Sequence, residues 1–439
     1  MSSIPYRKYS ITTFNAMEEG DLMNTNAQIQ YPGFRWFVLT TLCIVTATSA
    51  MIMIAPTPII EAISKTMGLS RGEVSGITMV TFNLFLALSA IAGGALIDRF
   101  GVLRVWFACL ILLIAGVALV PYVGDTGRGM TLIRVLMGCG TGPIMAAIVT
   151  VAAQWFPMKE RGIVTGIQGF SVSLGIFLGF RIVPQLFTST GNWQTAFAWL
   201  NVGNFAALIL TLIVALGPRP PLEKQDTVEA PQTGGSDFRL ALLQIATWAG
   251  IACGFLNSWE YQAFNDLIPN YLAIDPPVGI GLGVIGAGNL MSICTIAYMI
   301  GSILSGVISE KFFSGRSMPV VILGFLISAV FAFAVKYPYM YSNKTILLVC
   351  LILIGFWAAV INPQVCAFIA KNYPEHISGK IAGIAMALFG FGATLGLSAG
   401  SYALHKTGLY MMSINLVAAA ALLGVIAAFF MKPPKVFSK

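Results

Sequence analysis

The sequence predicts an all-α membrane protein in which twelve transmembrane helices form two pseudo-symmetric six-helix bundles. Three observations lead to this fold class: the composition, the number of apolar stretches and an internal repeat. Of the 439 residues, 57% are hydrophobic and only 10% are charged, and the mean hydropathy is +0.83. A soluble core does not need that much apolar surface, so we expect much of it to face lipid.

About 20 apolar residues in a helix cross the roughly 30 Å of hydrocarbon in a bilayer. Twelve stretches reach this length: 37–60, 76–97, 103–123, 130–155, 162–187, 193–216, 240–272, 283–308, 318–336, 345–369, 381–402 and 408–431. Six precede the polar stretch 217–238 and six follow it. The seventh is long enough to bend or break.

These stretches predict an N-terminal bundle, 35–216, and a C-terminal bundle, 240–432, joined by a cytoplasmic linker, 217–239. Residues 1–34 and 433–439 are expected to be cytoplasmic tails. Residues 1–30 contain no apolar segment of the kind that a cleavable signal peptide has.

Motifs of the first half return in the second half at a nearly constant distance. Phe156-Pro157 reappears 217 residues later as Tyr373-Pro374. Four glycines follow at the same offset: Gly162, Gly166, Gly175 and Gly179 correspond to Gly379, Gly383, Gly392 and Gly396. A parallel duplication within a membrane chain indicates a transporter whose halves rock against each other.

Basic residues predict the orientation. If the N-terminus is cytoplasmic, the cytoplasmic segments hold 17 of the 25 Lys and Arg residues and the opposite side holds six. The positive-inside rule then puts both termini in the cytoplasm. The same bias explains the net charge of +8, so no nucleic-acid partner is needed. We expect a multi-pass protein of the plasma membrane, which in a bacterium is the inner membrane, and a monomer.

Several classes of protein find no support in the sequence. There is no Gly-rich phosphate-binding loop of an ATP-driven pump. The two histidines, His376 and His405, lie in or beside predicted loops, and the seven cysteines lie in the apolar stretches without a paired motif. We therefore expect neither an enzyme nor a metal or cofactor site.

The segment between the second and third spans carries a motif that resembles the major facilitator superfamily. Its residues are Gly94, Asp98, Arg99, Gly101 and Arg104, with Val102 where the family has a further basic residue. Glu310 and Lys311 repeat the acidic-basic pair in the second half, 212 residues after Asp98 and Arg99. We interpret these residues as a conformational latch that opens when the halves rock, because Gly94 would let two helices approach closely and Asp98 could pair with a basic residue or a helix N-terminus.

Two further segments resemble the same family. Arg134, Gly138, Gly142 and Pro143 in span four match its second motif, and residues 155–166 are similar to the loop found in organic-anion transporters. Phe180 follows Gly179 where proton-driven drug exporters have a Gly-Pro step, which makes drug efflux less favoured. The resemblance covers about 35–432 and implies that spans one, four, seven and ten line a central cavity, flanked by spans two, five, eight and eleven.

A charged side chain in hydrocarbon costs from about 3 to over 10 kcal/mol, so each one within a span needs a reason. Two are cations. Arg134 either reaches the outer interface, braces span one, or tunes the proton affinity of a carboxylate. Arg181 is the candidate for binding a substrate anion, since its planar guanidinium suits a carboxylate; a structural ion pair or an interfacial position are the alternatives.

Two intramembrane residues are acids. Glu260, near the middle of span seven, is the main candidate for a proton-coupling site, because burial disfavours the charged form of a carboxyl group. Asp266 is a second candidate, although its position near Pro269 favours a solvated helix end. Five uncharged residues complete the candidate substrate pocket: Asn83, Gln168, Tyr298, Trp357 and Asn362.

These residues predict a secondary active transporter that moves a small organic anion, of carboxylate type, by alternating access and in symport with protons. Anion exchange or uniport would use the same arginine without Glu260. Export of a drug-like or neutral solute would fit the aromatic and polar residues nearly as well. A nutrient sensor of the same fold that does not transport is the alternative from a different class.

Overall fold

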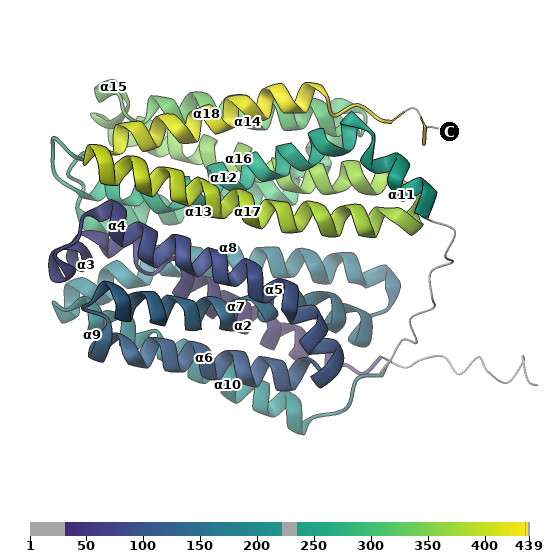
Figure 1. The fold of residues 1–439 in the computed structure, drawn as a ribbon, viewed down its shortest axis with the longest axis horizontal. Coiled ribbons are helices and arrows are strands. Elements are labelled where there is room, and N and C mark those ends of the chain that lie inside the picture. Colours follow the sequence, from purple (N-terminus) through teal and green to yellow (C-terminus); the bar gives the residue numbers. More distant parts are fainter. Residues whose placement is uncertain (1–30, 222–234, 435, 438–439) are drawn as a thin grey trace, which may run out of the picture.

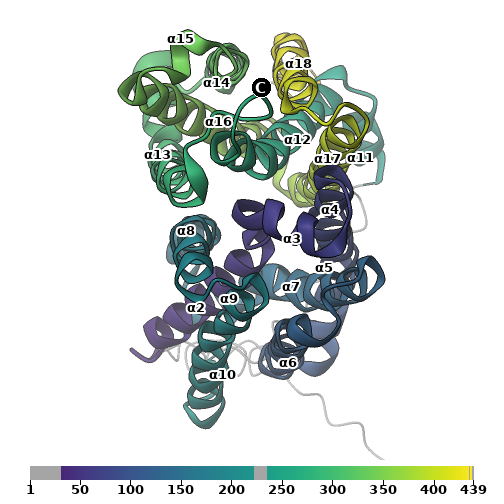
Figure 2. The same ribbon diagram turned by 90° about the vertical axis from the view of Figure 1, so that its left-hand side faces the viewer.

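The computed structural model describes residues 31–221, 235–434 and 436–437. The predicted linker and both predicted tails therefore lie partly outside the described residues. Every element of regular structure in the described part is helical. Figures 1 and 2 show the helices gathered into two groups, an N-terminal bundle and a C-terminal bundle, that lie side by side along their length.

The elements of the N-terminal bundle are α2 (Arg35–Ile54), η1 (Thr57–Ile59), α3 (Ile60–Met67), α4 (Arg71–Ser75), η2 (Gly76–Val80), α5 (Thr81–Phe100), α6 (Val102–Val123), α7 (Gly127–Trp155), α8 (Met158–Thr190), α9 (Trp193–Trp199) and α10 (Asn201–Leu216). Those of the C-terminal bundle are α11 (Gly235–Leu242), α12 (Ile245–Ala273), α13 (Gly283–Phe313), α14 (Ser317–Ala334), α15 (Pro338–Tyr341), α16 (Lys344–Asn372), α17 (Glu375–Thr407) and α18 (Tyr410–Phe429). Two ends of the molecule are named below by their elements: the α4 end, where α3, α4 and α15 lie, and the α11 end (Figure 1).

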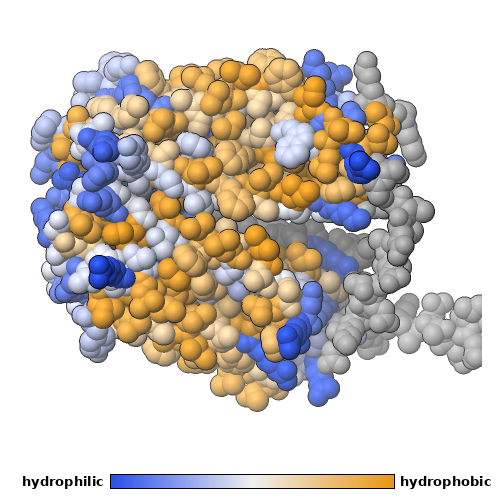
Figure 3. Space-filling view, in the orientation of Figure 1, coloured by the Kyte–Doolittle hydropathy of each residue, from blue (hydrophilic) through white to orange (hydrophobic). Residues whose placement is uncertain are grey.

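Eleven helical segments of the described chain are long and apolar enough to cross a membrane. The remaining long helix, α12, has 29 residues but carries several polar and acidic side chains, which lower its hydropathy. Other helices of the bundle surround it, and most of its residues are buried (Figure 2). With α12, the predicted twelve transmembrane helices are confirmed. On the face that Figure 3 draws, apolar side chains cover the middle of the molecule and hydrophilic side chains gather toward both ends.

The predicted break in the seventh span is present between α11 and α12, where Gln244 adopts an extended conformation. Side chains of the following turn bind carbonyls next to the break, one of which, that of Ala241, also accepts from the Gln244 N–H at 3.1 Å. The Thr247 hydroxyl donates to the Ala241 carbonyl at 2.5 Å, and the Trp248 indole donates to the Leu242 carbonyl at 2.8 Å. Carbonyl groups at the break between α11 and α12 are thereby hydrogen-bonded, although the helical backbone pattern is interrupted there.

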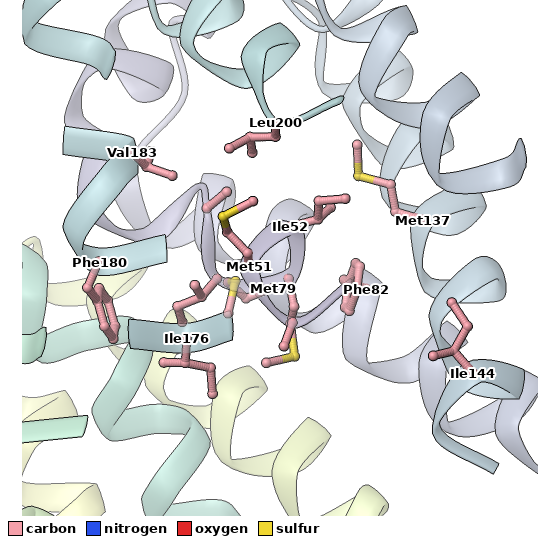
Figure 4. Packing of buried hydrophobic residues seen from close by; sticks show 14 of the residues in the cluster. Met51, Ile52, Met79, Phe82, Met137, Ile144, Ile176, Phe180, Val183 and Leu200 are labelled. Atoms are coloured by element: carbon pink, nitrogen blue, oxygen red, sulfur yellow. The ribbon is translucent and has the colours of Figure 1, made fainter. Parts of the chain in front are cut away.

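The first span also breaks, and this break shapes the site. α2 ends at Ile54 because Pro56 and Pro58 have no N–H group to donate, and the chain makes the 3₁₀ turn η1 before α3. Apolar side chains from α2, α5, α7 and α8 pack around this region, Met51, Ile52 and Phe82 among them (Figure 4).

Candidate functional site: a cavity between the bundles

A cavity of about 490 Å³ lies between the two bundles. Its walls come from α2, α5, α7 and α8 on one side and from α12, α16 and α17 on the other. These are spans one, two, four and five together with seven, ten and eleven, so the resemblance placed the cavity on the correct helices. Span eight, which is α13, does not contribute among the described lining residues.

The polar part of this cavity consists of uncharged side chains. Gln262 of α12 donates to the Asn83 oxygen of α5 at 2.7 Å, and this hydrogen bond joins the two bundles. Ser258 and Asn362 also line the cavity, and the Asn362 side-chain oxygen is buried without a hydrogen-bond partner among the described residues. Unpaired amide and hydroxyl groups beside apolar walls are typical of a site for a small polar molecule.

The α4 end of the cavity is closed by direct contact between the bundles. Ser75 donates to the Asp266 carboxylate, the Ser75 and Ser401 hydroxyls lie 2.6 Å apart, and Thr57 donates to Asp266 at 3.2 Å. The backbones approach closely as well, since a Cβ on Gly72 would lie 2.4 Å from backbone atoms of α17. The cavity lining continues from the middle of the helices toward the α11 end, where Figure 3 shows the surface hollowed between the bundles.

Asp266 is part of this closure. The expectation of a solvated helix end is wrong, because Asp266 is 1% exposed and α12 continues past Pro269 to Ala273. The hydroxyls of Thr57 and Ser75 replace water as its hydrogen-bond donors. Those donors belong to the N-terminal bundle, so the carboxylate holds the two bundles together only while the α4 end is closed.

Arg134 is fully buried and does not reach an interface. Its guanidinium donates to three backbone carbonyls, Thr78 at 2.6 Å, Ile52 at 3.0 Å and Met53 at 2.8 Å, and lies 4.4 Å from the centroid of the Phe82 ring. The Ile52 carbonyl would bind the N–H of residue 56 in a continuous helix, but that residue is proline. Arg134 thus braces the broken end of α2, as one of the alternatives expected, and Met53, whose carbonyl it binds, lines the cavity.

Glu260 is 1% exposed, and neither of its carboxylate oxygens has a hydrogen-bond partner among the described residues. It does not line the central cavity. It lines a separate cavity of about 10 Å³ within the C-terminal bundle, together with Tyr298 of α13. The Tyr298 ring stacks against Tyr261, with the ring centroids 4.4 Å apart.

Arg181 lies on the outside of the helix contact between the bundles. It is exposed and donates to the Asn289 side chain of α13, and the described lining of the central cavity does not include it. Gln168 is also displaced from the cavity, because its amide donates to the Met145 carbonyl of α7 at 3.0 Å. Trp357 packs inside the C-terminal bundle beside Phe356.

Of the predicted pocket residues, the structure therefore brings Asn83 and Asn362 to the central cavity. Ser258, Tyr261 and Gln262 also line it and were not predicted. A signal for them exists in the sequence. Ser258 and Gln262 are four residues apart, so they share one face of a membrane helix. Polar residues at that spacing indicate a face that lines a water-filled cavity.

The latch residues lie at the α11 end. Asp98, Arg99 and Glu310 are exposed, and Gly101 has φ +83°, which lets the chain turn sharply from α5 into α6. Arg104 and Lys311 are also exposed. Gly94 was expected to let two helices approach closely. That expectation is wrong in this conformation, because a Cβ on Gly94 would meet no atom within 4 Å.

Two bundles of membrane helices with a largely apolar cavity between them, into which a few polar side chains point, are typical of membrane transport proteins. The model of the Major Facilitator Superfamily matches residues 42–276 and 250–439, so the chain belongs to that family. It is a transporter and not an enzyme.

Several relatives carry curated names of probable anion transporters. The chain is 25% identical over 392 residues to the probable galactarate/D-glucarate transporter GarP of Escherichia coli, covering 80% of this chain and 84% of GarP. It is 23% identical to probable anion transporter 5 of Arabidopsis thaliana over 78% of this chain and 80% of that protein. The matches to the chloroplastic probable anion transporters 3 and 4 of the same plant span only 47% and 42% of those proteins.

Solved structures show the same fold. A bacterial homologue of the human lysosomal transporter Spinster, in an inward-facing and unoccupied conformation, superposes with a TM-score of 0.72 at 17% identity. The match covers 92% of this chain and 97% of that one.

Proposed function

We propose that this protein is a secondary active transporter that carries a small organic anion, of carboxylate type, by alternating access and together with protons. The observation that carries the proposal is the central cavity, which lies between the bundles and is closed at the α4 end. The N-terminal bundle contributes the Asn83 amide to its polar lining, and the C-terminal bundle contributes amide and hydroxyl groups. A ligand bound there would contact both halves, so its binding can drive their movement.

The cavity suits a small polar anion in size and chemistry. Its volume lies within the range of about 300–1,000 Å³ that small-molecule sites occupy. The Gln262 amide and the Ser258 hydroxyl can donate hydrogen bonds to carboxylate oxygens. The positive charge of Arg134 lies behind Met53, close to this wall, and a low-dielectric surrounding strengthens its attraction for an anion.

Arg181 is proposed to bind the anion in the opposite conformation. While the α4 end is closed, its guanidinium is engaged by Asn289 of the other bundle. When α8 and α13 separate, that partner is lost, and an incoming carboxylate can take its place through two parallel hydrogen bonds.

The proposed rocking step exchanges one set of contacts for another. Opening the α4 end breaks the hydroxyl bonds to Asp266, and closing the α11 end brings the latch residues together. The excess of basic residues at the α11 end supports a cytoplasmic location for that end and for both termini in a plasma membrane. We propose that one chain is the transporting unit, because the cavity is formed within it.

Glu260 is proposed to carry the coupling proton. An isolated carboxyl group with no hydrogen-bond partner is strongly disfavoured as an anion inside a bundle, so it is expected to be protonated in this conformation. Exchange or uniport of anions would leave Glu260 without a role, and a neutral solute would also fit the uncharged cavity.

The test is a ligand screen with purified protein, followed by uptake into proteoliposomes. D-glucarate and galactarate, which the name of the GarP relative suggests, are compared with monocarboxylates, neutral sugars and amphipathic cations. A ligand at 100 times its Kd stabilises the folded state by about 2.7 kcal/mol, which a thermal-shift assay detects. Stabilisation and uptake confined to sugars or cations would reject the anion proposal, and binding without uptake would favour a sensor.

A further inference from the structure

The small cavity beside Glu260 is separate from the central cavity and has walls from α12, α13 and α16. Its volume of about 10 Å³ is close to the smallest space that holds one water molecule. The Glu260 carboxyl group is the one carboxyl group of the described lining, and neither of its oxygens has a hydrogen-bond partner among the described residues. The hydroxyl of Ser328, on α14, lies within reach of Glu260 but donates to the Phe325 carbonyl at 3.2 Å.

Helix geometry explains how the two cavities share α12. Successive residues of a helix are about 100° apart, so Glu260 and Gln262 point in directions about 200° apart, with Tyr261 between them. Gln262 lines the central cavity and Glu260 lines the small one. Of the described residues that line these two cavities, Tyr261 is the one that they share. Its ring lies against that of Tyr298.

We propose that Glu260 in its small cavity is protonated from the central cavity, and that the Tyr261–Tyr298 pair is the barrier between the two cavities. This inference rests on the proposed proton coupling. A hydronium ion in the central cavity transfers a proton to one Glu260 oxygen when the Tyr261 ring turns away. An O–H bond forms on the carboxyl group, and the hydronium ion leaves as water. Substrate beside Tyr261 would control when the ring turns.

Few other groups in this cavity can exchange a proton. α13 contributes Tyr298 and Cys294, α12 contributes Tyr261, and α16 contributes only apolar residues to the described lining. Since α14 offers only the Ser328 hydroxyl, Glu260 has no second charge in these walls with which to share a proton.

Cys294 provides a natural reporter, because it lines the cavity and is buried. The matched control is Cys350, which is equally buried on α16 but donates to the Phe331 carbonyl and is not part of the described lining. Two full-length proteins are made, each retaining one of these cysteines and carrying alanine at the other six. Each is combined with Tyr261→Phe and Tyr261→Ala, and the rate of reaction with Ag⁺ is measured by counting the remaining thiols after denaturation.

We expect Tyr261→Ala to raise the reaction rate of Cys294 at least tenfold and Tyr261→Phe, which keeps the ring, to leave it within about twofold. The rate of Cys350 should be unchanged in both. An unchanged Cys294 rate in Tyr261→Ala overturns the barrier, and an equal rise at Cys350 assigns the effect to general loosening instead.

Proteoliposomes separate this inference from the proposed function. Because Tyr261 also lines the central cavity, the accumulation driven by a pH gradient is divided by the exchange rate of the same variant, and this ratio should fall at least fivefold in Tyr261→Ala. If the wild-type protein ignores the gradient, proton coupling fails, although the Ag⁺ rates still report whether the barrier exists. If the wild-type protein responds and Tyr261→Ala responds equally, the barrier is rejected and coupling stands.

Discussion

At the scale of single residues, charges inside the membrane have three different roles. Arg134 satisfies carbonyls at a broken helix, Asp266 joins the bundles, and Glu260 stands alone in a small cavity. Burial in hydrocarbon is costly for each of the three side chains, so what distinguishes them is the set of hydrogen-bonding groups around each one. An ionisable residue within a span therefore indicates a site that the fold or the function needs, but it does not indicate which role the residue has.

Replacement of Arg134 should affect stability before it affects transport. Arg134→Lys keeps the charge, but one ammonium group cannot reach carbonyls on both α2 and η2. If two carbonyls lose their donor, the free energy of unfolding should fall by about 2–4 kcal/mol. Thermal unfolding in detergent measures it, with Arg128→Lys, an exposed position on the same helix, as the control. Equal melting temperatures for the two variants would contradict the brace.

Replacement of Glu260 should affect coupling. We expect the substrate affinity of the wild-type protein to fall as pH rises, because deprotonation of Glu260 removes the ion that binds together with the anion, and linkage makes the effect reciprocal. Glu260→Gln imitates the protonated group, so its affinity should be independent of pH and exchange should continue. Binding titrations across pH test this. An unchanged pH profile in the variant would leave exchange or uniport as the mechanism.

At the scale of elements, closure depends on how near two helices can come. α4 meets α17 at Gly72, where a Cβ would lie 2.4 Å from the backbone of His405 and Ser401. At the edge of this contact the Ser70 hydroxyl and the His405 ring lie 2.8 Å apart. Small residues and short hydroxyls thus permit a tight contact that larger side chains would prevent.

Gly72→Ala should therefore shift the protein toward the conformation that is open at the α4 end. Neither backbone can move aside cheaply, so the helices must separate. Spin labels on cysteines placed at Lys65 and Lys406, both exposed, report the distance between the bundles. Gly76→Ala is the control, because its Cβ would meet no atom within 4 Å. Identical distance distributions in the two variants would show that the contact does not control opening.

The latch makes the complementary prediction for the α11 end. Asp98 is exposed while this end is open, so Asp98→Asn should leave substrate affinity within a few-fold. Because the latch is proposed to hold the α11 end closed, Asp98→Asn should slow transport at least tenfold. Uptake rates and binding are compared with those of Asp125→Asn, an exposed acid in another loop. Loss of binding with normal exchange at saturating substrate would reject the latch.

At the scale of the whole molecule, the internal repeat predicts symmetry. Residues 35–216 and 240–432 should superpose as six-helix bundles about an axis along the membrane normal, and each bundle should contain two inverted three-helix repeats. Superposition of the two halves, in conformations open at either end, tests this. Antiparallel halves, or different helix orders in the two halves, would contradict it.

The sequence by itself determined the fold class and the family. Composition, the lengths of the apolar stretches and the offset of 217 residues can all be read along the sequence. Because a bilayer of fixed thickness requires helices of a fixed length, these properties predict the number of helices and the internal repeat. Even the break in span seven was visible as excess length. Arg134, Glu260 and Asp266 were found because an apolar chain makes every charge conspicuous.

Only the tertiary structure decided what those residues contact. Arg181 and Gln168 were placed in the pocket by the span they occupy, but the face of a helix decides its partner, and theirs meet Asn289 and Met145. Gln262 was missed for the same reason. Which side of α12 faces the central cavity and which encloses Glu260 depends on how helices from both halves pack around it. That packing arises from contacts between residues far apart in sequence, which helical spacing alone does not specify.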